Sequence, residues 1–190
     1  MKKNLVTAIL MTIATTILLG IDYPLVVTAL AQLLFHDKAN GRLIVENGRV
    51  IGSHIIGQAF SGSGYFHSRP SAAGSGYDAT ASNGSQLAPT NRQLIDRVKD
   101  EVAKAQADNP GTSVPIDLVT ASASGLDFDI TPAAAAFQLP RVARARAMNE
   151  NVLRQLVAKH TEGRQLGFLG EPRVNVLELN LDLDGRSSAR

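Results

Sequence analysis

The stretch LVTAILMTIATTILLGIDYPLVVTALAQLLF, residues 5–35, decides the fold class of this chain, because it is almost entirely apolar. About 20 such residues suffice for a helix to cross the hydrocarbon core of a bilayer, and a soluble domain seldom spends so long a run on one helix. We therefore predict a transmembrane anchor over residues 5–35, preceded by a cytoplasmic N-terminus at residues 1–4 and followed by one domain at residues 36–190.

A cleaved secretory signal is the alternative reading of this segment. Lys2 and Lys3 give it a positive start, and Ala29-Leu30-Ala31 has the small-x-small form of a cleavage site. The apolar region before that site exceeds the usual ~7 to 15 residues and continues beyond it, so we expect the anchor to be retained. Because the lysines lie at the short N-terminal end, they favour an N-terminus inside the cytoplasm and a domain outside it.

Asp22, which precedes Tyr23 and Pro24, interrupts the apolar run. A carboxylate near mid-membrane costs about 2.5 to 3.5 kcal/mol on insertion scales, and a proline removes a helical N–H donor. Either Asp22 meets a polar group of a partner, or residues 5–21 cross the bilayer and Asp22 lies at the outer interface. We predict that Asp22 faces a partner helix rather than lipid.

The remainder predicts an α+β fold, in which a single N-terminal transmembrane helix is followed by one mixed α/β extracytoplasmic domain. Residues 42–57 predict a β-hairpin, since Asn-Gly at its centre tolerates the positive φ of a tight turn. Residues 58–89 are rich in Gly, Ser and Ala and predict a long loop, which in a compact domain is uncommon unless it is functional or flexible. Further elements follow from caps and periodicity: helices from Thr90 to Asn109, from Thr131 with a kink or restart at Pro140, and from Asn149 to His160, and strands over 116–119 and 174–183.

Motifs for catalysis are weak. The chain has no Gly-x-x-x-x-Gly-Lys phosphate loop, no His-Glu-x-x-His pair and no cysteine, and its four histidines are widely separated. A hydrolase would need a grouping such as Ser124, His67 and Asp127, yet no Gly-x-Ser-x-Gly elbow surrounds any loop serine. A formal net charge of +2, with scattered basic residues, does not indicate a nucleic-acid partner.

The hydroxyl-rich loop at residues 120–125 has two interpretations. Exposed backbone N–H groups and Ser/Thr hydroxyls ahead of a helix can cradle an anion. Arg141, Arg144 and Arg146 could supply the counter-charge, or could simply be exposed on a helix. The other interpretation is a loop that only turns the chain.

Several blocks of this sequence resemble one family. They are YFHSRPSA at 65–72, DLVTASASGLD at 117–127, RVARAR at 141–146 and GEPRVNVL at 170–177. In this order they resemble the C subunit of the bacterial potassium-transporting P-type ATPase, the Kdp system, over nearly the full length. Asn83-Gly84-Ser85 stands where Gly-Gly-Ser is usual, and Phe128-Asp129 also departs from the family pattern.

The resemblance implies a non-catalytic accessory subunit of an ATP-driven potassium uptake complex in the cell inner membrane. Its implied partners are a channel-like potassium-translocating subunit and an ATP-hydrolysing subunit, to which catalysis belongs, and no cofactor or metal of its own is expected. The implied alternative is a catalytic chaperone that raises the ATP affinity of the hydrolysing subunit through a transient ternary complex with ATP. For that role the family suggests contacts at Ser122, Ser124, Gly125 and Gln138.

Two further expectations concern partners and nucleotide. Tyr65, Phe66 and Arg69 are residue types that anchor interfaces, so we expect the loop at 58–89 to pack on another subunit and to be mobile alone. We also expect no physiologically relevant ATP site, because the predicted topology puts the domain outside the cytoplasm.

Overall fold

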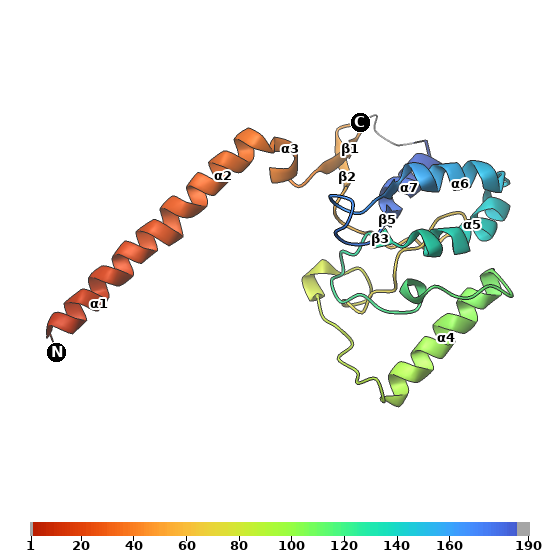
Figure 1. Ribbon diagram of the computed structural model, residues 1–190, viewed down its shortest axis with the longest axis horizontal. Helices are drawn as coiled ribbons and strands as arrows, with labels where there is room; N and C mark the ends of the chain where they lie inside the picture. Colours follow the sequence, from red (N-terminus) through yellow and green to blue (C-terminus); the bar gives the residue numbers. More distant parts are fainter. Residues whose placement is uncertain (1, 186–190) are drawn as a thin grey trace. The chain divides into compact units, whose positions relative to one another are not determined.

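The computed structural model describes residues 2–185 of the chain. These divide into two compact units, one ending at Ser53 and the other beginning at His54. The division falls within the range 42–57 that the sequence predicted as a hairpin, and the predicted bounds of the folded domain, residues 36–190, stay a prediction. Figure 1 labels most of the helices and strands of both units.

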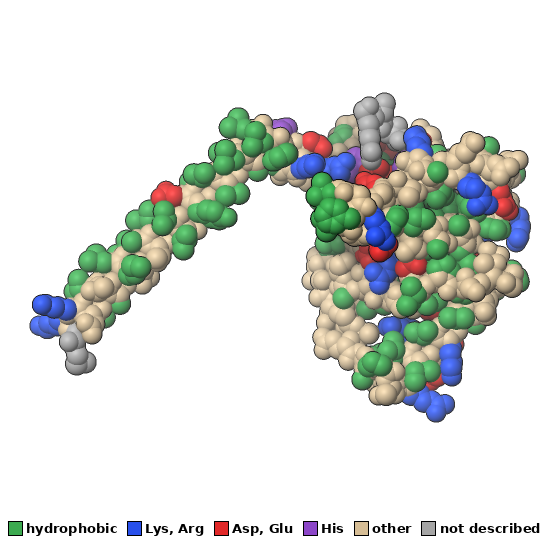
Figure 2. Space-filling model, in the orientation of Figure 1, with side chains coloured by type: hydrophobic (Ala, Val, Ile, Leu, Met, Phe, Trp, Pro, Cys, Tyr) green, Lys and Arg blue, Asp and Glu red, His purple; other side chains and the backbone are tan. Residues whose placement is uncertain are grey.

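The first unit begins with one helical segment, Lys2–Leu34, which is 33 residues long and apolar enough to cross a membrane. It comprises α1 (Lys2–Thr15), a π-helical turn (Thr16–Asp22) and α2 (Tyr23–Leu34). Pro24 lies in the first turn of α2, directly after the π-helical turn. A local π-helical turn can accommodate the backbone N–H donor that proline lacks. Hydrophobic side chains are distributed along the visible face of the helix in Figure 2, and basic ones lie at its start. The predicted apolar helix is confirmed.

A β-hairpin completes the first unit after the short helix α3 (His36–Ala39). Strands β1 (Leu43–Glu46) and β2 (Arg49–Ser53) pair antiparallel, with a register shift between Ile44 and Val45 at which β2 has one extra residue. Asn47 and Gly48 have φ angles of 51° and 76°, as a tight turn with a matching twist requires. The hairpin is therefore where the sequence predicted it.

The second unit combines helices with a small sheet. Strands β3 (Asp129–Ile130), β5 (Arg173–Asn175) and β4 (Thr161–Glu162) form an antiparallel sheet in that order. The helices are α4 (Arg92–Asp108), α5 (Pro132–Arg146), α6 (Glu150–Lys159) and α7 (Val176–Leu183). Residues 58–89 contain one 3-10 turn, Ala79–Ala81, and are otherwise irregular, as predicted.

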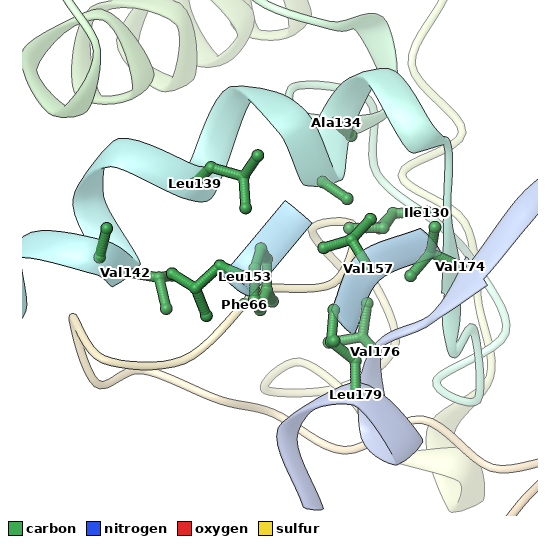
Figure 3. Packing of buried hydrophobic residues seen from close by; sticks show 12 residues of the cluster. Phe66, Ile130, Ala134, Leu139, Val142, Leu153, Val157, Val174, Val176 and Leu179 are labelled. Carbon is green, nitrogen blue, oxygen red and sulfur yellow. The ribbon is translucent and has the colours of Figure 1, made fainter. Parts of the chain in front are cut away.

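One hydrophobic core lies between α5, α6, α7 and the sheet (Figure 3). Its large members come from helices, strands and the long loop: Leu139 and Val142 of α5, Leu153 and Val157 of α6, Ile130 of β3, Val174 of β5, Val176 and Leu179 of α7, and Phe66 of the long loop. No residue of α4 is buried, although this helix is amphipathic, so it contributes nothing to the core. The core thus ties the long loop to the C-terminal helices.

Three predicted elements differ from the structure, wholly or in part. The run at 174–183 forms a strand only up to Asn175, whose side chain then accepts the Glu178 N–H at 3.0 Å and caps α7. The helix that begins at Pro132 continues through Pro140 to Arg146, so it does not restart there, and both of its halves pack on the same core. Residues 116–118 form a 3-10 turn instead of a strand.

Candidate functional site

Two buried side-chain amides hold consecutive residues of the long loop. Asn180 of α7 accepts the Phe66 N–H at 2.9 Å and donates to the Phe66 carbonyl at 2.9 Å. Gln138 of α5 accepts the His67 N–H at 2.7 Å and donates to the His67 carbonyl at 3.0 Å. Each amide therefore takes the place of a neighbouring strand and satisfies both backbone groups of one loop residue.

Arg141 of α5 binds carbonyl oxygens of the same loop. Arg141 donates to Ser63 at 2.7 Å and to Tyr65 at 3.0 Å, and also to Gln138 Oε1 at 2.7 Å. Burial lowers the pKa of Arg141, and nearby Asp108 partly offsets this shift. The arginine is thus buried as a structural donor, so the interpretation of an exposed basic run does not hold for it.

Arg146 of α5 contacts the loop at Tyr65. Its guanidinium stacks over the Tyr65 ring at 4.7 Å and donates to Asp184 at 2.8 Å. The Tyr65 hydroxyl donates to the same carboxylate at 2.9 Å. The ring, cation and carboxylate together fasten the loop to the end of α7.

The loop at 120–125 is held by backbone hydrogen bonds to residues 70–72 and by the hydroxyls of its own serines. Ser122 is buried and pairs through its backbone with Pro70 and Ala72, both at 2.7 Å. Its hydroxyl lies 3.1 Å from the Ser124 hydroxyl, which accepts the Leu126 N–H at 3.1 Å. These contacts are those of a loop that shapes the chain, and they engage the two hydroxyls proposed as ligand contacts.

Gly125 occupies a position that excludes any side chain. Its φ is +69°, and a Cβ there would come within 2.7 Å of the Asp78 carbonyl oxygen. Glycine is therefore required for the close approach of two backbone segments as well as for the left-handed conformation.

A cavity of about 450 Å³ lies between α4, α5 and the long loop. Its lining mixes aromatic rings with polar and charged groups, including Phe60, His67, Lys104, Phe137, Gln138 and Arg141. Burial, followed by the charge of Arg141, lowers the pKa of His67, so its imidazole is neutral near pH 7. Of the predicted ligand contacts, Gln138 lines the cavity, whereas Ser122, Ser124 and Gly125 do not line it. The cavity therefore takes in one of the four residues, and a nucleotide contact at any of them stays a prediction.

The grouping considered for a hydrolase does not assemble. The His67 ring contacts the Gly62 carbonyl at 3.0 Å, and Asp127 accepts from Arg69 at 3.0 Å. The Ser124 hydroxyl is engaged with its neighbouring serine. Among residues 2–185, no cluster of His, Asp and Glu has the geometry to hold a metal ion.

A cluster of imidazoles and carboxylates joins the start of the second unit to α6 and α7. His54 Nδ1 lies 2.7 Å from Glu178 Oε1, and His160 Nε2 lies 2.9 Å from Asp182 Oδ2. Lys159 Nζ also contacts Asp182 at 2.8 Å. Hydrogen bonding to Glu178, followed by Asp182, raises the pKa of His160 against the opposing effect of burial. This cluster was missed from the sequence, where its histidines are far apart.

The residues predicted to face a partner differ in how far they are buried. Phe66 is fully buried in the core, so its prediction as a partner-facing residue is wrong. Tyr65 and Arg69 are half-buried and engaged within the domain, and their contact with a partner stays a prediction. Asp22 ends the π-helical turn and is exposed in this single chain, so its partner also stays a prediction.

Asn180 was not singled out from the sequence. The signal that could have found it is an amide inside an otherwise apolar run, since a buried polar group requires hydrogen-bond partners. The same reasoning applies to Gln138, which lies between Phe137 and Leu139.

Comparison with known proteins supplies the family. The family described as KdpC, K+-transporting ATPase, c chain, matches residues 5–185. A potassium-transporting ATPase KdpC subunit of Koribacter versatilis is 65% identical over 185 residues, covering 97% of this chain and 96% of that protein. The subunits of the same name from Acidobacterium capsulatum and Rhodopseudomonas palustris are 60% and 54% identical, with at least 96% of each chain covered. This chain therefore belongs to the KdpC family, the c chain of the potassium-transporting ATPase.

Proposed function

We propose that this chain is a non-catalytic accessory subunit of a high-affinity, ATP-driven potassium uptake complex, which it stabilises and which needs it for activity. The observation that carries this proposal is the family match over residues 5–185, which includes both the apolar helix and the folded unit. The partners proposed are a channel-like potassium-translocating subunit and an ATP-hydrolysing subunit of the same membrane complex.

The internal contacts support a scaffolding role. Gln138, Arg141 and Asn180 are buried, and each spends hydrogen bonds on the backbone of the long loop. Buried side chains that are hydrogen-bonded to the long loop fix the shape of that loop. A subunit that holds other subunits together requires a surface of fixed shape. We propose that the N-terminus is cytoplasmic and that the folded unit lies outside the inner membrane, because Lys2 and Lys3 flank the short end of the helix.

The test compares cells that produce the other subunits with and without this chain. Potassium uptake from a medium of limiting potassium and co-purification of the other subunits should both be lost without it. Full uptake and an intact complex in its absence would contradict the proposal.

The topology has its own test. A cysteine introduced by Ser124→Cys would be the only thiol of the chain, since the sequence has none. Because Ser124 is only half-buried, a membrane-impermeant thiol reagent should label it on intact cells. Labelling only after the cells are opened would invert the proposed orientation.

The alternative function is that of a catalytic chaperone which raises the ATP affinity of the hydrolysing subunit. The cavity favours it, because Phe60 and Phe137 offer aromatic surfaces close to Lys104 and Arg141. Under the proposed topology, however, cytoplasmic ATP does not reach this cavity, and the chain holds no tightly bound cofactor.

Calorimetry on the full chain in detergent, at physiological ionic strength, separates the two functions. We expect only weak, salt-sensitive binding that does not distinguish ATP from inorganic triphosphate. Saturable micromolar binding that prefers ATP and disappears in Lys104→Ala would favour the chaperone instead.

A further inference from the structure

The segment between β4 and β5 carries a group of exposed hydrophobic side chains that the core does not use. Leu166, Phe168 and Leu169 have exposed fractions of 84%, 68% and 47%. We call these three residues the apolar tip, and residues 164–171 the tip loop. Single exposed leucines are ordinary on protein surfaces, whereas three large apolar side chains within four positions are a concentrated apolar surface.

The backbone of the tip loop satisfies its own hydrogen bonds. Gln165 and Leu169 exchange two backbone bonds of 2.9 Å, and the Gly167 and Phe168 N–H groups bond back to Arg164 and Gln165 at 3.1 and 3.2 Å. Such a turn can enter an apolar environment without leaving these backbone donors stranded.

The conformation of the tip loop is fixed although its side chains are exposed. Leu166 has a φ of 53°, a left-handed conformation that is unfavourable for a leucine. Arg164 and Glu171 close the base of the loop with an ion pair of 2.8 Å. The strands on either side, β4 and β5, are paired in the sheet, and Arg173 contacts Glu162 across them at 2.7 Å. An unfavourable turn that holds a large apolar side chain toward solvent is a feature expected of a functional loop.

The charges around the apolar tip indicate a protein rather than a lipid surface. Arg164 is paired with Glu171 and Arg173 with Glu162, so the two cations beside the tip have carboxylate partners. A loop that binds the membrane surface gains from unpaired basic residues facing anionic lipids. An apolar centre inside a rim of both charges is instead the usual composition of a protein interface.

We propose that the apolar tip is an anchor that inserts into an apolar groove on another subunit of the potassium-transporting ATPase, outside the hydrocarbon core. The inference rests on the proposed accessory function, since the family places this chain in an assembly of several subunits. The proposed contact is made by the tip loop, whose apolar side chains are accessible, and not by Phe66, which is buried in the core.

Cross-linking in native membranes tests the contact directly. Phe168 is replaced by the photoreactive p-benzoylphenylalanine in the full chain, produced together with the other subunits. A covalent adduct with one of those subunits is expected. The same substitution at Ile116, which is 74% exposed and lies outside the tip loop, is the matched control and should give little of this adduct. Adducts with lipid alone at Phe168 would overturn the proposal in favour of a membrane contact.

A double variant measures how much the tip contributes. Leu166→Ser with Phe168→Ser should weaken recovery of the complex at least tenfold, because buried apolar anchors dominate interface affinity. Ile116→Ser should leave recovery unchanged. Circular dichroism of the purified full chain should show both variants folded, since all three positions are exposed.

Undiminished recovery with the double variant would refute the anchor, even if the complex still needs the chain. If removing the whole chain has no effect on the complex, the accessory function itself fails. The two failures are therefore distinguishable.

Discussion

The buried amide of Asn180 gives the sharpest prediction about stability. Asn180→Leu keeps a side chain of similar volume but removes both hydrogen bonds to Phe66, each 2.9 Å long. Phe66 and Asn180 are both almost completely buried, so water cannot replace the lost partner. Each stranded backbone group costs about 1–3 kcal/mol, which gives about 2–6 kcal/mol for the pair.

Some of this cost is recovered, because leucine adds apolar surface to a hydrophobic site. We therefore expect a net loss of about 3 kcal/mol in the free energy of unfolding. For a unit of this size, that corresponds to a fall of roughly 10 °C in the unfolding midpoint. Against a total stability of about 5–15 kcal/mol, the change is large enough to expose the long loop.

The assay is urea and thermal unfolding of the full chain in a mild detergent, followed by circular dichroism. Asn151→Leu is the matched control, since Asn151 is an exposed helical asparagine of α6 and its replacement should change stability by less than about 0.5 kcal/mol. A loss in Asn180→Leu no larger than that of the control would refute the view that the amide replaces a strand partner.

Three other substitutions test different parts of the chain. Gly125→Ala should destabilise the folded unit by about 1–3 kcal/mol, measured by urea unfolding, whereas Gly163→Ala, which meets no neighbour, should not. Because the pKa of His160 is raised in the folded state, its charge stabilises fully below the unfolded pKa of about 6.5, and this stabilisation is lost as pH rises through the folded value. His160→Gln should thus destabilise more at about pH 5.5 than at about pH 9, and an equal loss at both would contradict the linkage. Asp22→Leu should loosen the complex during detergent purification, and unchanged co-purification would leave only the interfacial location for this carboxylate.

Local chemistry accounts for the elements that were predicted correctly. Thr131 accepts the Ala134 N–H and Pro132 occupies the first turn, so α5 starts where a cap and a proline coincide. Asn149 caps α6 in a similar way. Asn91, rather than Thr90, caps α4 by accepting the Gln93 N–H, so the predicted start was wrong by one residue. Such signals act over a few residues and are visible in the sequence.

The candidate site could not be predicted to the same degree, because its contacts span long sequence separations. Gln138 binds a residue 71 positions away, and Asn180 binds one 114 positions away. Their partners are backbone groups, which carry no residue-specific signal. Only the folded chain shows that Phe66, which looks like an interface residue in a loop, is a core residue.

The sequence by itself determined the apolar helix, the hairpin turn at Asn47-Gly48 and the helix caps, because each depends on hydropathy or on the backbone preferences of neighbouring residues. Tertiary structure decided whether residues 176–183 form a strand or a helix, since their apolar positions suit both periods. Burial of Val176, Leu179 and Asn180 against Phe66 and α6 selects the helix. It also decided that α5 continues through Pro140, because packing of both halves on one core outweighs a single missing hydrogen bond.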